Sequence, residues 1–190
     1  MAWTREASDE TLLAAYGDGD VTAFEALFRR YQEPLRRHLT RMLNDRDLAE
    51  DLVIETFQRL HVHRTELRAN AAVRPWVYTI ANNLARNRRS RERLARWLPL
   101  AVVDRERRVE PAGAAVGSGD EVQRRVTAAL AALPERQREA CSLRLVDDLS
   151  LEDIARVTGA SVGTVKSRLF YGQRRLRELL ADVDPEGREP

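Results

Sequence analysis

A segment without helical or strand periodicity divides this 190-residue chain into two blocks. Residues 97–119 contain two prolines, three glycines and a serine among mixed charges, and no regular apolar spacing continues through them. Such a composition predicts a flexible linker. The blocks at residues 20–96 and 120–182 are each short, so each must fold as a small domain. We assign residues 1–19 to an N-terminal extension and residues 183–190 to a C-terminal tail.

Both blocks carry apolar residues at the spacing of α-helices. In the first block this spacing runs from Phe24 to Leu43, and Pro34 within it should kink or interrupt the helix. A second helix is expected from about Asp45 and a third from Pro75, which suits a first helical turn. These two helices should bury Leu48, Leu52, Val53, Thr56, Phe57 and Leu60, and Val77, Ile80, Ala81 and Leu84. We therefore predict an all-α protein of two small helical domains.

The sequence argues against a membrane, disulfide-rich or metal-dependent protein. It has no run of eighteen apolar residues, which argues against membrane insertion, and its first ten residues do not resemble a signal peptide. Cys141 is the only cysteine, and His61 and His63 are two residues apart and do not face each other on a helix. We predict a cytoplasmic protein with no metal, cofactor or catalytic residue. An enzyme is the least favoured class, since no phosphate-binding glycine loop is present.

One side of the second predicted helix is acidic. At about 100° per residue, Asp47, Glu50 and Asp51 share a face with Ile54 and Gln58, opposite the apolar stripe. Acidic faces are usually solvated, and from the residues alone we slightly favour that interpretation. The exposed Ile54 favours the alternative, because an apolar residue among carboxylates suits a protein partner with a basic, partly apolar surface. The face does not suit DNA.

The third predicted helix has a polar face without acids. Six arginines lie between residues 86 and 96, against the single acid Glu92. The alternative is a basic, solvated helix end with Trp76 in the core. We favour nucleic-acid contact, because arginine neutralises phosphates, asparagine pairs with base edges and aromatic rings stack on unpaired bases. The residues assigned to this face and its flanks are Trp76, Tyr78, Thr79, Asn82, Asn83, Arg86, Arg89 and Arg93.

The second block ends in the pattern of a helix-turn-helix. Ser150 opens a predicted capping box, Gly159 permits the positive φ of the turn, and Val165 would pack the next helix down. Ser161 can cap that second helix, which we expect to run through Tyr171. Its hydroxyl and basic side chains, with no acid over most of its length, suit entry into the DNA major groove. The residues assigned to DNA contact are Ser161, Thr164, Lys166, Ser167, Arg168, Tyr171 and Arg174.

These patterns together resemble the sigma factors of bacterial RNA polymerase, specifically the small extracytoplasmic-function (ECF) group. LPERQR at residues 133–138 and the stretch at 149–180 resemble the family's region four, and GTVKSRL at 163–169 is highly specific. AFEALFRRY, DLAEDLVIETF and RPWVYTIANNLAR, at residues 23–31, 47–57 and 74–86, resemble region two. The resemblance covers the chain except its first residues, the linker and the extreme C-terminus.

The resemblance implies a partner for each surface. The acidic face, with Thr56 and Phe57 nearby, would dock on the clamp helices of the polymerase β′ subunit, and Ile54, where the family commonly has Gln, would alter that docking. The loop at 64–74, including Arg74, and the third helix would bind the minus-ten element and its melted strand. The helix from Ser161 would bind the minus-thirty-five element.

Further partners and a cellular role also follow from the resemblance. The polymerase β flap would be a second docking site, and the linker would thread towards the polymerase active site. An anti-sigma factor is a further candidate partner. The protein would be an alternative sigma factor, responsive to stress or to the cell envelope, that confers promoter specificity and performs no catalysis.

A stand-alone helix-turn-helix transcriptional regulator is the alternative. Such a regulator would bind its operator without polymerase, usually as a two-fold dimer, and the first block would be a ligand-binding or dimerisation module. The acid-free face of the third helix argues against this alternative, because a sensor domain needs no second nucleic-acid surface.

Overall fold

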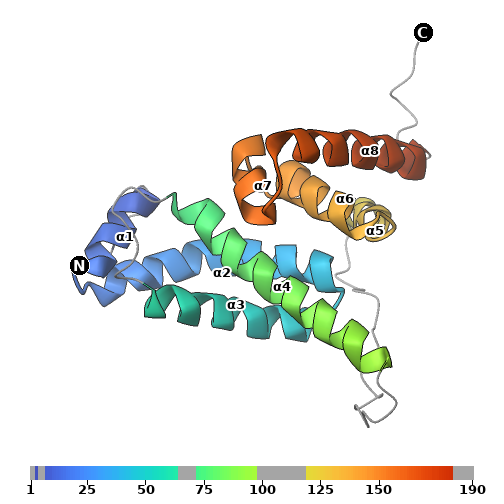
Figure 1. The fold of residues 1–190 in the computed structure, drawn as a ribbon. Helices are drawn as coiled ribbons and strands as arrows, with labels where there is room; N and C mark the ends of the chain where they lie inside the picture. Colours follow the sequence, from blue (N-terminus) through green and yellow to red (C-terminus); the bar gives the residue numbers. More distant parts are fainter. Residues whose placement is uncertain (1–2, 4–6, 64–71, 98–118, 182–190) are drawn as a thin grey trace. The chain divides into compact units, whose positions relative to one another are not determined.

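The computed structural model describes residue 3 and residues 7–63, 72–97 and 119–181, and every regular element in these ranges is helical (Figure 1). The chain divides into two compact units, Met1–Arg108 and Val109–Pro190. The predicted all-α fold is confirmed. The predicted linker lies outside the described residues except at its two ends, which belong to the flanking helices, and the predicted tail at 183–190 lies outside them entirely.

The described part of the first unit contains α1 (Asp9–Gly17), α2 (Val21–Leu43), α3 (Arg46–Val62) and α4 (Val73–Trp97), with α2 packed against the other three (Figure 1). Leu27, Leu35 and Leu39 on α2 have no exposed area. α2 continues through Pro34, so the predicted interruption does not occur. A proline inside a helix costs about 3 kcal/mol, and burial contributes about 2 kcal/mol for each of these leucines, which offsets that cost.

A helix lies within the segment that we assigned to an N-terminal extension. α1 packs on α2 and α4 and buries Leu12, Leu13 and Tyr16. Ser8 caps it by accepting a hydrogen bond from the Thr11 amide at 3.2 Å. This helix is hard to predict, because its run of Leu, Ala and Tyr shows little polar contrast around the helical circumference.

The predicted second and third helices of the first unit are present. All six residues expected to be buried on α3 are buried, and on α4 only Ile80 is less buried than expected, since it is half-buried. Pro75 lies in the first turn of α4, as predicted. The loop expected at 64–74 is shorter at its end, because Val73 and Arg74 already belong to α4; residues 64–71 lie outside the described residues.

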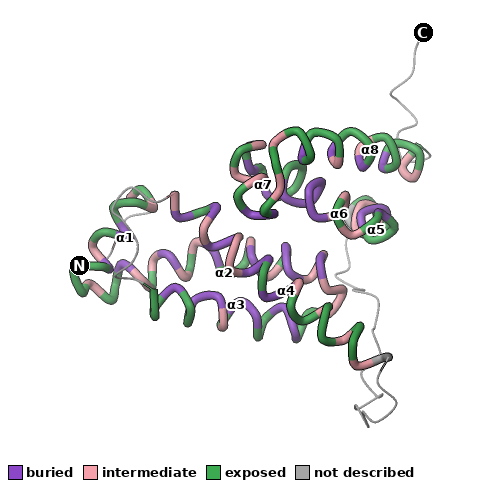
Figure 2. The backbone as a smooth tube through the Cα atoms, in the orientation of Figure 1, coloured by how far each residue is buried: buried purple, intermediate pink, exposed green. Residues whose placement is uncertain are grey.

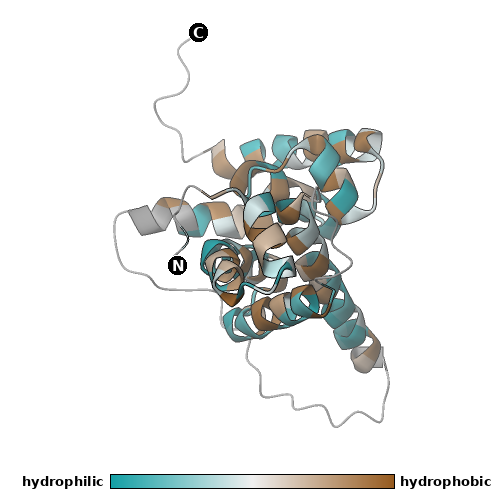
Figure 3. Ribbon diagram, turned by 90° about the vertical axis from the view of Figure 1, so that its left-hand side faces the viewer, coloured by the Kyte–Doolittle hydropathy of each residue, from teal (hydrophilic) through white to brown (hydrophobic). Residues whose placement is uncertain are grey.

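The described part of the second unit contains α5 (Gly119–Ala131), α6 (Glu135–Cys141), the π-helical turn η1 (Ser142–Val146), α7 (Leu151–Thr158) and α8 (Val162–Leu180). α8 packs against α5, α6 and α7. Its buried residues recur along one side of the helix (Figure 2). In Figure 3 hydrophilic and hydrophobic residues alternate along the helices, as expected for helices with one buried side.

A close contact joins α6 to α8. A Cβ atom added at Gly172 would lie 2.5 Å from the Cys141 Sγ atom, so only glycine fits this crossing unless the Cys141 side chain or one of the helices shifts. Burial raises the pKa of the Cys141 thiol to about 11. The prediction that Cys141 is a buried thiol is confirmed.

Two negative findings apply to the described residues. None of their helices is long and apolar enough to cross a membrane. Among the same residues, no cluster of three or more His, Cys, Asp or Glu side chains could hold a metal ion.

Candidate nucleic-acid interface

α7 and α8 form the predicted helix-turn-helix. Ser150 accepts a hydrogen bond from the Asp153 amide at 3.0 Å, and Ser161 accepts one from the Thr164 amide at 3.1 Å. Between the helices Gly159 adopts a left-handed conformation with φ of 63°. Both predicted caps and the predicted turn are confirmed, and together they fix where α8 begins.

The outward side of α8 carries polar and aromatic groups. At about 100° per residue, Gly163, Ser167, Phe170 and Arg174 lie opposite the buried stripe, and all four are exposed. Phe170, 63% exposed, forms an edge-to-face pair with the exposed Tyr171, with ring centroids 5.3 Å apart. Sequence reasoning did not assign Phe170 to DNA contact, although the same rotation that placed Ser167 and Arg174 on this face would have found it.

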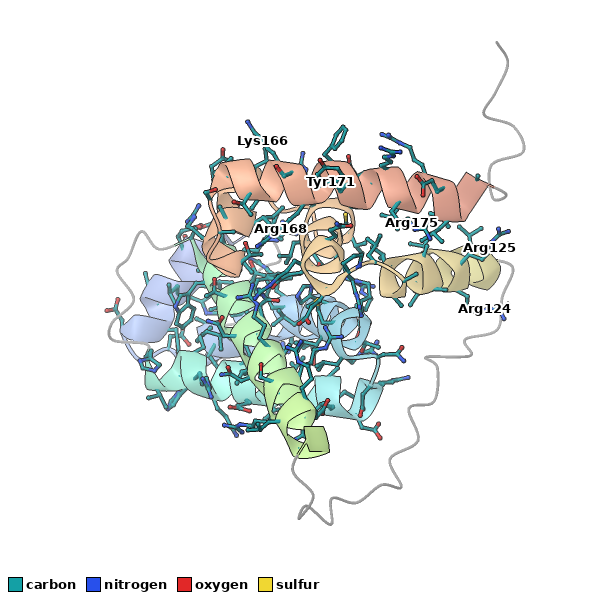
Figure 4. The ribbon with its side chains drawn as sticks, turned by 45° about the vertical axis from the view of Figure 1, so that its right-hand side comes forward. Arg124, Arg125, Lys166, Arg168, Tyr171 and Arg175 are labelled. Carbon is teal, nitrogen blue, oxygen red and sulfur yellow. The ribbon has the colours of Figure 1, made fainter. Side chains whose placement is uncertain are left out.

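The structure separates two cations that the sequence analysis placed together. Lys166 is exposed and points away from the second unit's other helices, whereas Arg168 lies on the opposite side of α8 (Figure 4). Arg168 is half-buried, and its Nη1 atom is buried without a hydrogen-bond partner among the described residues. Lys166 can therefore reach into a groove that α8 enters, while Arg168 can at most flank it.

The last turns of α8 place Arg175, which was not predicted from the sequence, beside the predicted Arg174. Arg175 donates a hydrogen bond to Glu178 at 2.8 Å, and Arg174 lies 3.6 Å from the same carboxylate. The Arg175 hydrogen bond is the main reason that the pKa of the Glu178 carboxyl is lowered. Figure 4 shows Arg175 on the side of α8 that faces α5, where Arg125 projects. Exposed ion pairs of this kind contribute little to stability.

The predicted nucleic-acid face of α4 is only partly exposed. Asn82 has no exposed area and Tyr78 has 1%, so neither can contact a ligand on the outer side of α4, which corrects the prediction. Tyr78 packs edge-to-face on His38, with ring centroids 5.3 Å apart. Asn83 is exposed, and Asn87, which sequence reasoning missed, is exposed one turn later on the same side.

The other predicted residues of α4 differ in accessibility. Arg93 and Arg74 are exposed, while Trp76, Thr79, Arg86 and Arg89 are half-buried. The Thr79 hydroxyl donates a hydrogen bond to the Pro75 carbonyl at 2.7 Å, which holds its side chain against the helix. The accessible outer face of α4 is therefore centred on Asn83 and Asn87.

The predicted acidic face of α3 is exposed as a continuous surface. Asp47, Glu50, Asp51 and Gln58 are exposed, and Ile54 among them is 54% exposed. The neighbouring residues Thr56 and Phe57 are buried; the Thr56 hydroxyl donates to the Leu52 carbonyl at 2.7 Å, and Phe57 packs on Phe24 and Phe28. These two residues can support the face but cannot touch a partner, which corrects their assignment as contacts.

Two family models match the chain along most of its helical length. Residues 27–95 match the model of sigma-70 region 2, and residues 123–176 match that of sigma-70 region 4. The chain is 36% identical to the RNA polymerase sigma factor CarQ of Myxococcus xanthus over 174 residues. That match spans 90% of this chain and 97% of the relative. It is 35% identical to the ECF RNA polymerase sigma factor SigM of Mycobacterium tuberculosis, over 92% of this chain and 86% of the relative.

The chain belongs to the ECF family of RNA polymerase sigma factors. Its structure is similar to that of the sigma factor RpoE of Bartonella quintana, solved in complex with the anti-sigma factor NepR, with a TM-score of 0.70 and 26% identity over 83% of this chain and 96% of that one. An ECF sigma factor directs promoter-specific initiation by RNA polymerase and is not an enzyme. This membership rules out the stand-alone regulator. The two matched regions fall in the two units, and α1 precedes the first of them.

Proposed function

We propose that this sigma factor binds the minus-thirty-five element with the outward side of α8. The observation that carries this proposal is the exposed side of the segment from Ser161 to Arg174, which has no carboxylate and lies opposite the buried stripe. Helix N-termini attract phosphates, and the second helix of a helix-turn-helix enters the major groove with its first residues against base edges. Thr164, Lys166 and Ser167 are the polar contacts at that end, and Tyr171 and Arg174 extend them.

The outer face of α4 is the proposed minus-ten surface. Asn83 and Asn87 offer paired donors and acceptors to base edges, and Arg93 supplies an exposed cation for the phosphate backbone. Trp76, Thr79, Arg86 and Arg89 lie half-buried around these residues and complete the surface. Because unpaired bases present more of their edges than paired bases do, such a surface suits the melted strand.

The acidic face of α3 is the proposed contact with the clamp helices of the polymerase β′ subunit, and the second unit would contact the β flap. Asp47, Glu50 and Asp51 provide charge for a basic partner, and the exposed Ile54 provides an apolar centre. Gln58 lies at the end of this face. Two weak DNA contacts on one polymerase then act together, because binding of one raises the effective concentration of the other.

Promoter-specific transcription by the reconstituted holoenzyme tests the proposal. Genomic DNA is transcribed with core polymerase alone and with core polymerase plus this chain, and the transcripts are sequenced. We expect a set of new start sites that share two upstream elements. Transcript start sites identical to those of core polymerase alone would contradict the proposed function.

Charge reversal on α3 tests the polymerase contact separately. Asp51→Arg should weaken holoenzyme assembly by about 2 kcal/mol, because it places a cation opposite a basic partner surface. A pull-down with core polymerase measures the loss. Glu25→Arg, an exposed reversal on α2, is the matched control and should assemble normally. Equal losses in both variants would mean that general charge, and not the α3 face, drives docking.

An anti-sigma factor is the proposed regulator, and the cytoplasm is the proposed site of action. The proposed regulator is supported by the solved complex of the Bartonella quintana sigma factor with NepR, because the sigma factor in that complex has a fold similar to that of this chain. A responsive role in stress or in envelope homeostasis would follow from release of such a partner.

A further inference from the structure

The C-terminal end of α4 extends beyond the rest of the first unit, past the ends of α2 and α3 (Figure 1). None of residues 87–95 is buried, so the other described residues of the unit cover no side of this part of the helix. Leu94 within it is 62% exposed. Most helices in proteins depend on packing for their stability, which makes this end of α4 a candidate surface for a partner.

Three exposed residues form a stripe along this end of the helix, and we call Asn87, Arg91 and Leu94 the α4 stripe. They follow the spacing i, i+4 and i+7, and at about 100° per residue they lie within about 60° of one another. The Arg91 guanidinium forms no hydrogen bond or ion pair with the described residues, whereas the nearby Arg88 pairs with Glu92 at 3.1 Å. The stripe thus presents an amide, an unpaired cation and an apolar side chain in that order.

The acidic face of α3 contains a stripe of the same spacing. Asp47, Asp51 and Ile54, the α3 stripe, also stand at i, i+4 and i+7 and are all exposed. Neither carboxylate has a hydrogen-bond or ion-pair partner among the residues that the structure describes, and Ile54 is 54% exposed. Each stripe therefore has two polar groups followed by one apolar side chain, and the charges of the two stripes are opposite.

The two stripes match when the helices that carry them pack side by side in the same direction. Because both helices advance about 1.5 Å per residue, contact of Ile54 with Leu94 also aligns the polar positions. Arg91 then donates to the Asp51 carboxylate, and the Asn87 amide donates to the next carboxylate along α3. DNA phosphates would pair with the cation of the α4 stripe but would leave its leucine in water, so a protein surface fits this stripe better.

The two stripes of one copy do not meet each other. α3 packs against α2 and α4 of the same unit through its buried residues, and the α3 stripe lies on the opposite side of the helix. The matching contact therefore requires a second copy of the chain.

We propose that free copies of this chain associate through these stripes, with the α4 stripe of one copy on the α3 stripe of another. Each copy has one stripe of each kind, so two copies form a closed pair with two contacts, or several copies form a chain. The α3 stripe is also part of the proposed polymerase contact. Association would cover that contact until core polymerase displaces the second copy, and this consequence rests on the proposed function.

Sedimentation of the full chain without polymerase tests the proposal. We expect the average mass to rise with protein concentration, and less so as salt is raised, because salt screens exposed ion pairs. Asp51→Arg and Arg91→Ala should each raise the dissociation constant about tenfold at low salt. Leu94→Ala should weaken association by a factor that does not change with salt, since an apolar contact is not screened.

A mixture of two variants tests whether the contact joins unlike stripes of different copies. Asp51→Arg keeps an intact α4 stripe and Arg91→Ala keeps an intact α3 stripe. Neither variant can associate with itself, but one contact can form between them. The mixture should therefore associate more tightly than either variant alone. A chain that carries both Asp51→Arg and Arg91→Asp exchanges the two charges and should recover the association of the wild type.

Two exposed substitutions serve as matched controls. Arg88→Ala changes the same end of α4 about 120° away from Leu94, and Glu25→Arg reverses a charge on α2. Both should associate as the wild type does. Thermal unfolding of every variant should match that of the wild type, because all the substituted residues are exposed.

Several outcomes would overturn the proposal. These are a mass of one copy at every concentration, association that persists in Asp51→Arg and Arg91→Ala, an equal loss in the controls, or a mixture no tighter than its components. Core polymerase added to the wild type should release the associated copies as holoenzyme forms, and assemblies that keep their size would contradict the shared α3 stripe. A holoenzyme without promoter-specific start sites would instead contradict the proposed function, and it would leave the sedimentation result unchanged.

Discussion

We predicted that α8 and α4 each bind nucleic acid with one face. The structure leaves more of the predicted face exposed on α8 than on α4. On α8 the exposed residues lie opposite one buried stripe. The predicted face is therefore accessible, except that Arg168 lies at its flank. On α4, Asn82 and Tyr78 of the predicted face are buried in the core. Arg74 lines a cavity on the other side of the helix. Both helices pack against three others, but the neighbours of α4 bury more of its circumference than a single stripe. How much of a helix's circumference is buried therefore decides how many of its exposed residues the sequence can identify.

The largest expected effect tests the tight packing of α8. Gly172→Val should destabilise the second unit by about 3 kcal/mol, because its Cβ would collide with the Cys141 Sγ atom. Thermal unfolding measures the loss. Adding Cys141→Ala to Gly172→Val should restore part of the stability, since it removes the atom that the new side chain meets. Equal melting of the single and double variants would mean that the α6–α8 crossing is looser than the structure shows.

The next effect separates two adjacent residues of α4. Asn82→Ala should lower the free energy of unfolding by about 2 kcal/mol, because it removes a buried polar side chain and leaves its surroundings unfilled. Asn83→Ala should leave the unfolding free energy unchanged and alter base preference at the minus-ten element. Chemical denaturation and promoter binding by holoenzyme measure the two effects. If Asn82→Ala changed base preference without loss of stability, the division of α4 would be wrong.

The smallest expected effect separates two cations of α8. Lys166→Ala should weaken binding to minus-thirty-five DNA by about 1 kcal/mol. It should also reduce the slope of log Kd against log salt concentration by about one. Arg168→Ala should have a smaller effect on the salt dependence, because Arg168 lies on the opposite side of the helix. Binding of the full chain to a duplex at several salt concentrations measures both slopes. Equal slopes for the two variants would place both residues on phosphates.

The predictable features of this chain are those set by local chemistry. Ser150 and Ser161 cap their helices, and Gly159 takes the left-handed turn, because each depends only on residues a few positions away. The buried stripe of α3 was equally predictable, since one helical period of apolar residues describes it fully.

The features that escaped prediction depend on contacts between distant residues. Asn82 belongs to the core because the surrounding helices cover it, and no local pattern distinguishes it from Asn83. The cavity needs Asp9, Arg30 and Arg74 from three helices, and α1 itself showed little amphipathic contrast. Phe170 was different, because helical rotation places it beside Ser167, but an apolar residue was not sought on a DNA-binding face.

The contact between Gly172 and Cys141 also bears on the chemical durability of this protein. Oxidation of a thiol begins with the thiolate and adds an oxygen atom to sulfur. Here the raised pKa disfavours the thiolate, and Cys141 has no exposed area through which an oxidant could reach Sγ. Peroxide should therefore leave Cys141 unmodified while the second unit is folded and should react with it only after that unit unfolds.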